Sequence, residues 1–171
     1  MTNTFPVELV KLDDPRLTPA DYASIRLLYL ETVKWCSQTQ RDPSTEDIHT
    51  VFSSPLSVWR AAFTKDTHTL PALVGLIGVE RINWIDRTAD PSIAIVPAAR
   101  RKGWSLAVAE AFRELLFKQF AIRRLQTVIL EGAPSRGLLE RLGFVHEGTL
   151  RSLRWVDGRY IDGLLYAWVK E

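Results

Sequence analysis

The stretch Val96–Ala107, with the sequence VPAARRKGWSLA, decides how this chain is organised. An apolar segment, Ile93–Val96, runs into Pro97, so we predict a strand that ends there. A basic loop follows, and the residues after Gly103 have the apolar periodicity of an amphipathic helix. Such a junction presents free backbone N–H groups and the positive end of a helix dipole. It therefore predicts a site for phosphate oxygens.

The side chains of this loop favour the same ligand. Arg100, Arg101 and Lys102 place mobile positive charge beside the backbone donors. Gly103 has no Cβ, so a ligand can approach the backbone closely. Taken alone, the pattern also fits an ordinary strand–loop–helix connection with a solvated basic turn.

Length and composition predict one domain that spans residues 1–171. Hydrophobic residues make up 46% of the chain and charged residues 25%, which is typical of a globular protein. No apolar run reaches the length of a membrane span, and the first residues do not resemble a signal peptide. A single cysteine, Cys36, fits a reducing compartment, so we expect a cytoplasmic protein without disulfides or a membrane partner.

Charge and histidine spacing narrow the choice of ligand. The net charge is only +2, with the positive excess in the second half of the chain. This distribution fits a small anionic ligand better than a nucleic-acid track. His49, His68 and His146 are widely spaced, so we predict no metal site.

The periodicity along the chain predicts an α+β fold. Thr18 is an expected N-cap, Ser44-Thr45-Glu46-Asp47 is expected to start a second helix, and Asp157-Gly158 is expected to form a hairpin turn. Gly132 or Ala133 is expected to cap the last helix. The expected strands span residues 5–12, 57–64, 72–83, 87–96, 124–130, 144–156 and 159–169, and the expected helices span 18–34, 44–52, 104–120 and 134–142.

Three motifs together suggest a family. They are the loop Arg100-x-x-Gly103-x-Ser105, the segment PSRGLLERLGF at Pro134–Phe144, and the hairpin Arg151–Asp162. Over residues 6–169 the chain resembles the GNAT acetyltransferases, and among them the branch like the ribosomal-protein N-acetyltransferases RimJ and RimL. The resemblance implies a mixed, mostly antiparallel sheet splayed in a V, with helices on both faces. Acetyl-CoA, or another acyl-CoA, would then enter between the strands 92–96 and 124–130 as co-substrate, with no metal.

The resemblance also implies the residues that hold this co-substrate. The backbone of Ile95 and Val96 would pair with the pantetheine amides, and the N–H groups of residues 101–106 would bind the pyrophosphate. The expected cofactor-binding residues are Ile95, Val96, Arg100, Arg101, Lys102, Gly103, Trp104, Ser105, Leu106 and Ser135. Ser105 replaces a family glycine or alanine, and it is small enough for CoA binding to survive.

Acyl transfer to an amine needs a base, because an alkylamine is almost fully protonated at neutral pH. Asp90 is the first candidate, since many family members carry a glutamate there; the alternative is a capping or solvent-facing role. Glu80 on the neighbouring strand is the second, and its alternative is an ion pair with Arg81 or Arg60. The N–H of Ala94 is the expected oxyanion donor.

Ser135 is expected to contact the CoA sulfur or to donate a proton to it. Its alternative is to satisfy backbone at the start of a helix. Two positions depart from the family pattern: Gly132 stands where asparagine is frequent, and Leu139 where a tyrosine acid often lies.

The residues and the resemblance together predict an acyl-CoA-dependent N-acyltransferase. Its primary amine, on a protein N-terminus or a small molecule, would attack directly in a ternary complex. The alternative is a catalytically inactive CoA-binding sensor or partner-binding module with the same fold. A third hypothesis is a nucleic-acid-associated transferase, which would use Arg123, Arg124, Arg136, Arg151 and Arg154. Family members often form homodimers, so we expect one here.

Overall fold

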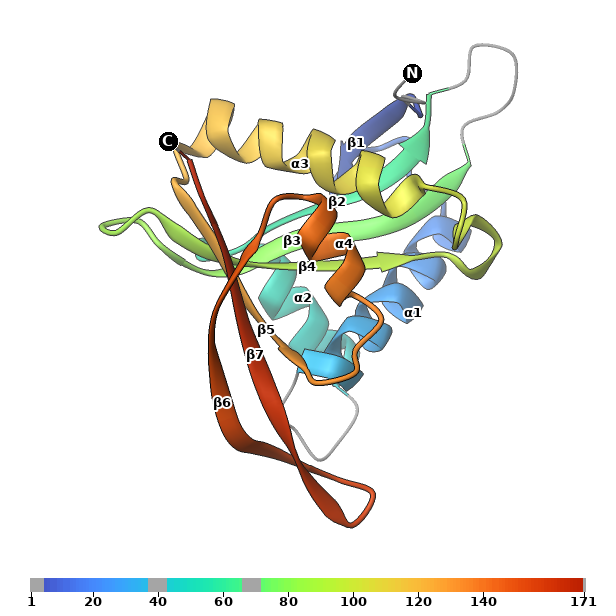
Figure 1. Cartoon of the computed structure of the whole chain (residues 1–171). Coiled ribbons are helices and arrows are strands. Elements are labelled where there is room, and N and C mark those ends of the chain that lie inside the picture. The colour runs from blue at the N-terminus through green and yellow to red at the C-terminus, as the bar shows by residue number, and fades with distance from the viewer. Residues whose placement is uncertain (1–4, 37–42, 66–71, 171) are drawn as a thin grey trace.

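The computed structural model describes residues 5–36, 43–65 and 72–170, and the account below concerns these residues. The expected connection at 37–42 and His68 lie outside them, as do the side chains of residues 33–36, including Cys36. The helices and strands follow one another in the predicted order (Figure 1). The elements are β1 Val7–Lys11, α1 Pro19–Cys36, α2 Thr45–Ser53, β2 Val58–Thr64, β3 Leu73–Asn83, β4 Thr88–Ile95, a 3₁₀ turn Pro97–Ala99, α3 Trp104–Phe120, β5 Arg124–Leu130, α4 Arg136–Arg141, β6 Val145–Val156 and β7 Arg159–Val169.

The strands form one seven-stranded sheet in the order β1-β2-β3-β4-β5-β7-β6. Every neighbouring pair is antiparallel except β4 and β5, which run parallel and pair only through Thr88 with Arg124 and Ala89 with Leu125. Past these two pairs the strands diverge, which gives the sheet its V shape (Figure 1). This confirms the predicted splayed sheet.

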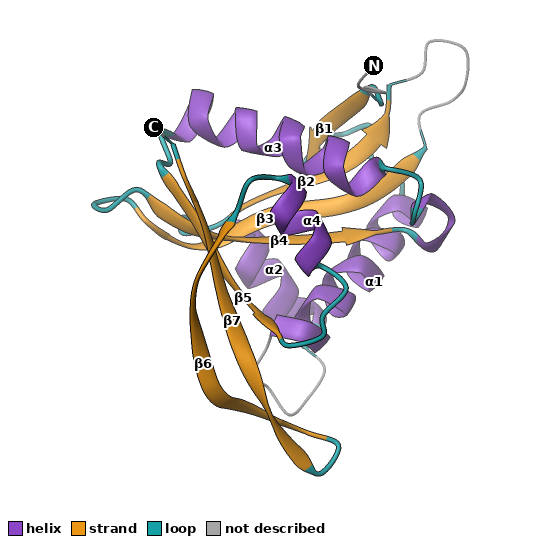
Figure 2. Cartoon of the chain, in the orientation of Figure 1, coloured by secondary structure: helices purple, strands orange, loops and turns teal. Residues whose placement is uncertain are grey.

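Helices cover both faces of the sheet, as expected (Figure 2). On one face α3 packs Val108, Phe112 and Leu116 into the larger of two buried clusters. On the other face α1 and α2 contribute Ile25 and Ile48, among others, to the second cluster. Burial of side chains of this size contributes about 1.5–3 kcal/mol each, so the two clusters fix the helices on the sheet.

The first two helices begin where capping chemistry predicts. The Thr18 hydroxyl accepts a hydrogen bond from the Asp21 N–H at 3.2 Å, while the Asp21 carboxylate accepts from the Thr18 N–H at 2.9 Å. Ser44 and Asp47 form the same reciprocal capping box before α2. The start of α4 was predicted wrongly. It begins at Arg136 with Ser135 as N-cap, not at Pro134 after Gly132 or Ala133.

The β6–β7 hairpin extends away from the rest of the sheet (Figure 1). It turns at Asp157 and Gly158, whose φ angles are 47° and 82°, so both adopt the left-handed conformation of a tight hairpin turn. Among the described residues, no helix is long and apolar enough to cross a membrane, and no three side chains gather that could hold a metal ion.

Candidate active site

The register of β4 decides which of its backbone groups face the opening of the V. The N–H of Val96 donates to the carbonyl of Val74 at 2.9 Å, so the backbone N–H of Val96 points toward the β3 side. Hydrogen-bonded pairs alternate along an antiparallel ladder, and Ala94 lies opposite Leu76 two residues earlier. The N–H of Ala94 therefore faces β3, while the backbone groups of Ile93 and Ile95 face β5.

This register changes two of the expected roles. Ala94 has its N–H committed to the ladder, so it is not placed to be an oxyanion donor. Val96 is also satisfied within the protein, because its carbonyl accepts from the Ala99 N–H at 2.9 Å. Ile95 keeps an N–H directed at the opening. A shift of the strand register by one residue turns each backbone N–H to the opposite edge of the strand. The sequence alone does not determine this register.

The loop after the 3₁₀ turn offers a series of backbone donors. Among the described residues, none accepts a hydrogen bond from the N–H groups of residues 101–105, whereas the N–H of Leu106 donates to the Gly103 carbonyl at 3.2 Å. Arg101 and Gly103 have φ angles of 59° and 92°, both in the left-handed region. Successive N–H groups in such a turn converge on one point and form an anion-binding concavity, so the loop fits a pyrophosphate.

Packing from the chain's N-terminal segment holds this loop in place. A Cβ on Gly103 would lie 2.9 Å from the ring of Phe5. That ring also packs on Trp104, with ring centroids 4.6 Å apart. Trp104 therefore supports the loop. Its partly buried indole packs against the core, while its backbone N–H donates to no described residue.

The three cations of the loop divide into two kinds. Arg100 is engaged inside the protein: its Nε donates to the Ile95 carbonyl at 2.8 Å, and its guanidinium pairs with Glu31 of α1. It ties α1 to the end of β4. Arg101 and Lys102 are exposed and have no ion-pair partner among the described residues, so they are the cations available to a ligand.

Two carboxylates lie at the point where the strands part. Asp90 directly follows Ala89, the last β4 residue paired with β5, and it lies opposite Glu80 of β3. Opposed residues of an antiparallel pair project their side chains on the same face. Asp90 forms an ion pair with Arg81, whose Nε donates to its carboxylate at 3.0 Å.

Glu80 has the more strongly altered environment of the two. Burial raises the pKa of its carboxyl above the usual value, an effect that the Arg81 charge and a hydrogen bond from the Tyr29 hydroxyl oppose, while the charge of Asp90 raises it further. Burial likewise raises the pKa of Tyr29. The expected alternative, an ion pair of Glu80, is absent among the described residues. Tyr29 is distant from Glu80 in the sequence, so the sequence alone did not indicate its effect on Glu80.

Ser135 lies in the connection between the end of β5 at Leu130 and the start of α4 at Arg136. Ser135 is the N-cap residue of α4, but its hydroxyl makes no hydrogen bond to a described residue, so the expected side-chain capping of the helix start is not observed. Leu139 is buried in the larger core cluster. The position where a tyrosine acid was considered is thus a core position in this chain.

Comparison with known proteins gives the family directly. Residues 15–145 match the acetyltransferase (GNAT) domain. The chain is 31% identical over 91 residues to the spermidine N(1)-acetyltransferase of Vibrio cholerae, covering 53% of each chain. It is 27% identical over 100 residues to the SPbeta prophage-derived uncharacterized N-acetyltransferase YokL of Bacillus subtilis, covering 58% of this chain and 56% of that one. Both matches span little more than half of the relative's length.

A solved structure agrees over almost the whole chain. The Vibrio cholerae spermidine N-acetyltransferase in complex with CoA and spermine superposes with a TM-score of 0.77, over 95% of both chains, at 19% identity. At this identity the likeness speaks for the fold alone. The motif loop, the splayed sheet and the match over most of the chain all agree: this chain belongs to the GNAT acetyltransferase family.

Proposed function

We propose that this protein transfers an acetyl group from acetyl-CoA to a primary amine, and that the amine attacks directly in a ternary complex. One observation carries the proposal: β4 leaves β5 after two residue pairs, and Glu80 and Asp90 lie at the point of departure. Backbone donors and a proton acceptor thus lie around one opening. Acetyl-CoA supplies the activated acyl thioester when bound.

The backbone and the loop orient the co-substrate. The N–H groups of Ile93 and Ile95 face the opening, where they can hydrogen-bond the pantetheine and the thioester oxygen. The free N–H groups of residues 101–105, with the exposed side chains of Arg101 and Lys102, bind the phosphates. Ser135 directs its hydroxyl to the departing sulfur.

Glu80 is the proposed base, in place of our first candidate Asp90. A base must be unpaired enough to accept a proton and must have a pKa close to the working pH. Burial raises the pKa of Glu80, whereas Asp90 is already paired with Arg81. Asp90 then acts on Glu80 through its charge, and the Tyr29 hydroxyl lowers the pKa of Glu80 against the effect of burial.

The acceptor we propose is a polyamine such as spermidine. The support is the spermidine N-acetyltransferase of Vibrio cholerae, which this chain resembles in sequence over about half of its length and in fold over 95% of the chain. The carboxylates Glu80 and Asp90 favour a cationic acceptor. The RimJ/RimL-like branch, a single domain over residues 1–171, a homodimer and a cytoplasmic location also remain proposals, supported by the motifs and the composition.

The test is release of free thiol from acetyl-CoA in the presence of spermidine, with an N-terminal peptide amine as second acceptor. We expect amine-dependent release and a product heavier by one acetyl group. Release with the peptide alone would favour a protein acceptor and overturn the polyamine assignment. Tight CoA binding without transfer to any amine would instead support the inactive CoA-binding module.

A further inference from the structure

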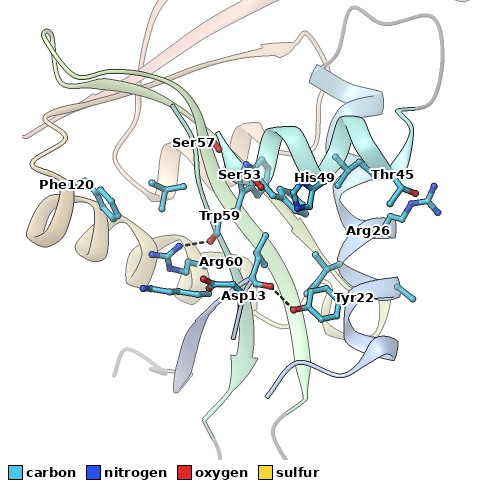
Figure 3. Close-up of a pocket in the computed structure, with 17 residues that line it drawn as sticks. Asp13, Tyr22, Arg26, Thr45, His49, Ser53, Ser57, Trp59, Arg60 and Phe120 are labelled. Atoms are coloured by element: carbon cyan, nitrogen blue, oxygen red, sulfur yellow. Dashed lines mark hydrogen bonds between the residues drawn. The ribbon is translucent and has the colours of Figure 1, made fainter. Parts of the chain in front are cut away.

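A second cavity lies away from the opening between β4 and β5. It has a volume of about 730 Å³ and lies at the edge of the sheet, where β1 ends and β2 continues without it. The last β1–β2 pair is Lys11 with Arg60, so Val58 and Trp59 have no partner strand on that side. The first half of α1, α2 and the end of α3 enclose the rest (Figure 3).

The wall combines apolar surface with an excess of positive charge. Phe120 supplies aromatic surface on the α3 face of the sheet, and Phe52 and the ring of Tyr22 supply it on the α1–α2 face, whereas the Trp59 indole is buried in the core. The charged lining residues are Lys11, Arg26 and Arg60, against the single acid Asp13. None of these three cations forms an ion pair with a described residue.

Arg60 is the cation whose position needs an explanation. Its guanidinium is half-buried, and Nη1 donates to the carbonyl of Trp59 at 2.7 Å (Figure 3). Its Nε and Nη2 have no acceptor among the described residues. Burial lowers the pKa of Arg60, which the charge of Asp13 opposes, yet a guanidinium stays protonated in proteins. A half-buried charge with free donors is costly unless an anion pairs with it.

A carboxylate matches the free donors best. The guanidinium presents its N–H groups in a planar fork that two carboxylate oxygens can occupy together. The volume is within the usual range for small-molecule sites, and the aromatic wall suits a flat apolar body. We propose that this cavity binds a small carboxylic acid with an aromatic or apolar body, and that its carboxylate pairs with Arg60.

The probe is 3-phenylpropionate, with neutral 3-phenylpropionamide as its matched control. Chemical shifts of ¹⁵N-labelled protein are followed, after saturation with CoA so that the basic loop at 101–106 is occupied. A ligand of this size should bind with a dissociation constant of about 1 mM, and the amide roughly tenfold more weakly. The shifts should map to α1, α2 and the edge of β2, and the Arg60 Nε–H signal should move.

Two variants make the proposal falsifiable. Arg60→Gln should weaken binding roughly tenfold to a hundredfold, while Arg123→Gln, at an exposed site after α3, should leave it unchanged. If Arg60→Gln does not fold, Ala23→Phe on the exposed side of α1 fills the cavity instead and should abolish binding. No saturable shift up to about 20 mM acid, or equal binding of acid and amide, would overturn the proposal.

Discussion

Glu80 of β3 and Asp90 of β4 face each other across an antiparallel pair, one residue past the last contact between β4 and β5. The sheet therefore places two carboxylates at the point where its strands part. Asp90 is paired with Arg81, while the Tyr29 hydroxyl lowers the pKa of Glu80 and so opposes the effect of burial. Asp90 is therefore the carboxylate engaged in an ion pair, and Glu80 is the one whose pKa is raised by burial.

The rate of acetyl transfer should depend on the protonation of Glu80. Its carboxyl must be ionised to accept a proton, and its pKa lies above the ordinary 4.5. We therefore expect kcat/KM to rise as the pH rises through that raised pKa. Asp90→Asn removes a charge that raises the pKa, so the rising limb should move to lower pH. A limb that stays in place would contradict the coupling.

The raised pKa of Glu80 should also affect the stability of the protein, which should fall as the pH rises, whereas kcat/KM rises. The folded protein holds the Glu80 proton at pH values where the unfolded chain, with a pKa near 4.5, has released it. The free energy of unfolding of the wild type, relative to Glu80→Gln, should therefore fall as the pH rises above 4.5, and level off above the folded pKa. Urea titrations of both proteins across this range measure the difference. A difference that rises with pH would contradict burial as the dominant cause.

Gly103 should be required for CoA binding. Its φ of 92° strains any side chain, and a Cβ would lie 2.9 Å from the Phe5 ring, so Gly103→Ala should displace the loop. We expect CoA affinity to fall roughly tenfold or more, since a shifted loop loses backbone hydrogen bonds to charged oxygens. Gly137→Ala is the matched control, because no atom lies within 4 Å of its Cβ position and alanine favours its helix. Calorimetric titration with CoA compares the two; equal affinities would remove the loop from the site.

Gly78 should contribute to the stability of the fold rather than to activity. A Cβ there would lie 2.2 Å from the indole of Trp59, which is held between Tyr29 and Phe52. Gly78→Ala should therefore lower the free energy of unfolding by roughly 1–3 kcal/mol through overpacking. Gly148→Ala on β6, with no atom within 4 Å, should change it little. Thermal unfolding of the two variants measures the contrast, and equal melting temperatures would mean that the indole moves freely.

Local chemistry explains why most elements were predictable from the sequence. The cap at Thr18, the helix start at Ser44–Asp47, the strand end before Pro97 and the turn at Asp157-Gly158 depend on a few neighbouring residues, and each prediction is confirmed. The basic loop was recognisable because its cations and glycine lie next to one another in sequence.

The details of the site depend on long-range geometry that the sequence does not display. Whether the N–H of Ala94 or of Ile95 faces the opening depends on which β4 residues hydrogen-bond to β3. The bond from the Val96 N–H to the Val74 carbonyl shows this only in the folded sheet. The choice between Glu80 and Asp90 depends on Arg81 and on Tyr29 of a distant helix. Arg100 looked like a ligand for phosphate, and its partner Glu31 lies in that same helix.

The most direct test of the account is kcat/KM for spermidine, with saturating acetyl-CoA at neutral pH, in the wild type and in Glu80→Gln. We predict a loss of roughly 10²–10⁴-fold in the variant, with CoA affinity unchanged, because a general base contributes about that much. Glu110→Gln, on the exposed side of α3, should keep wild-type activity. Wild-type turnover by Glu80→Gln would contradict the assignment of Glu80 as the base at this opening.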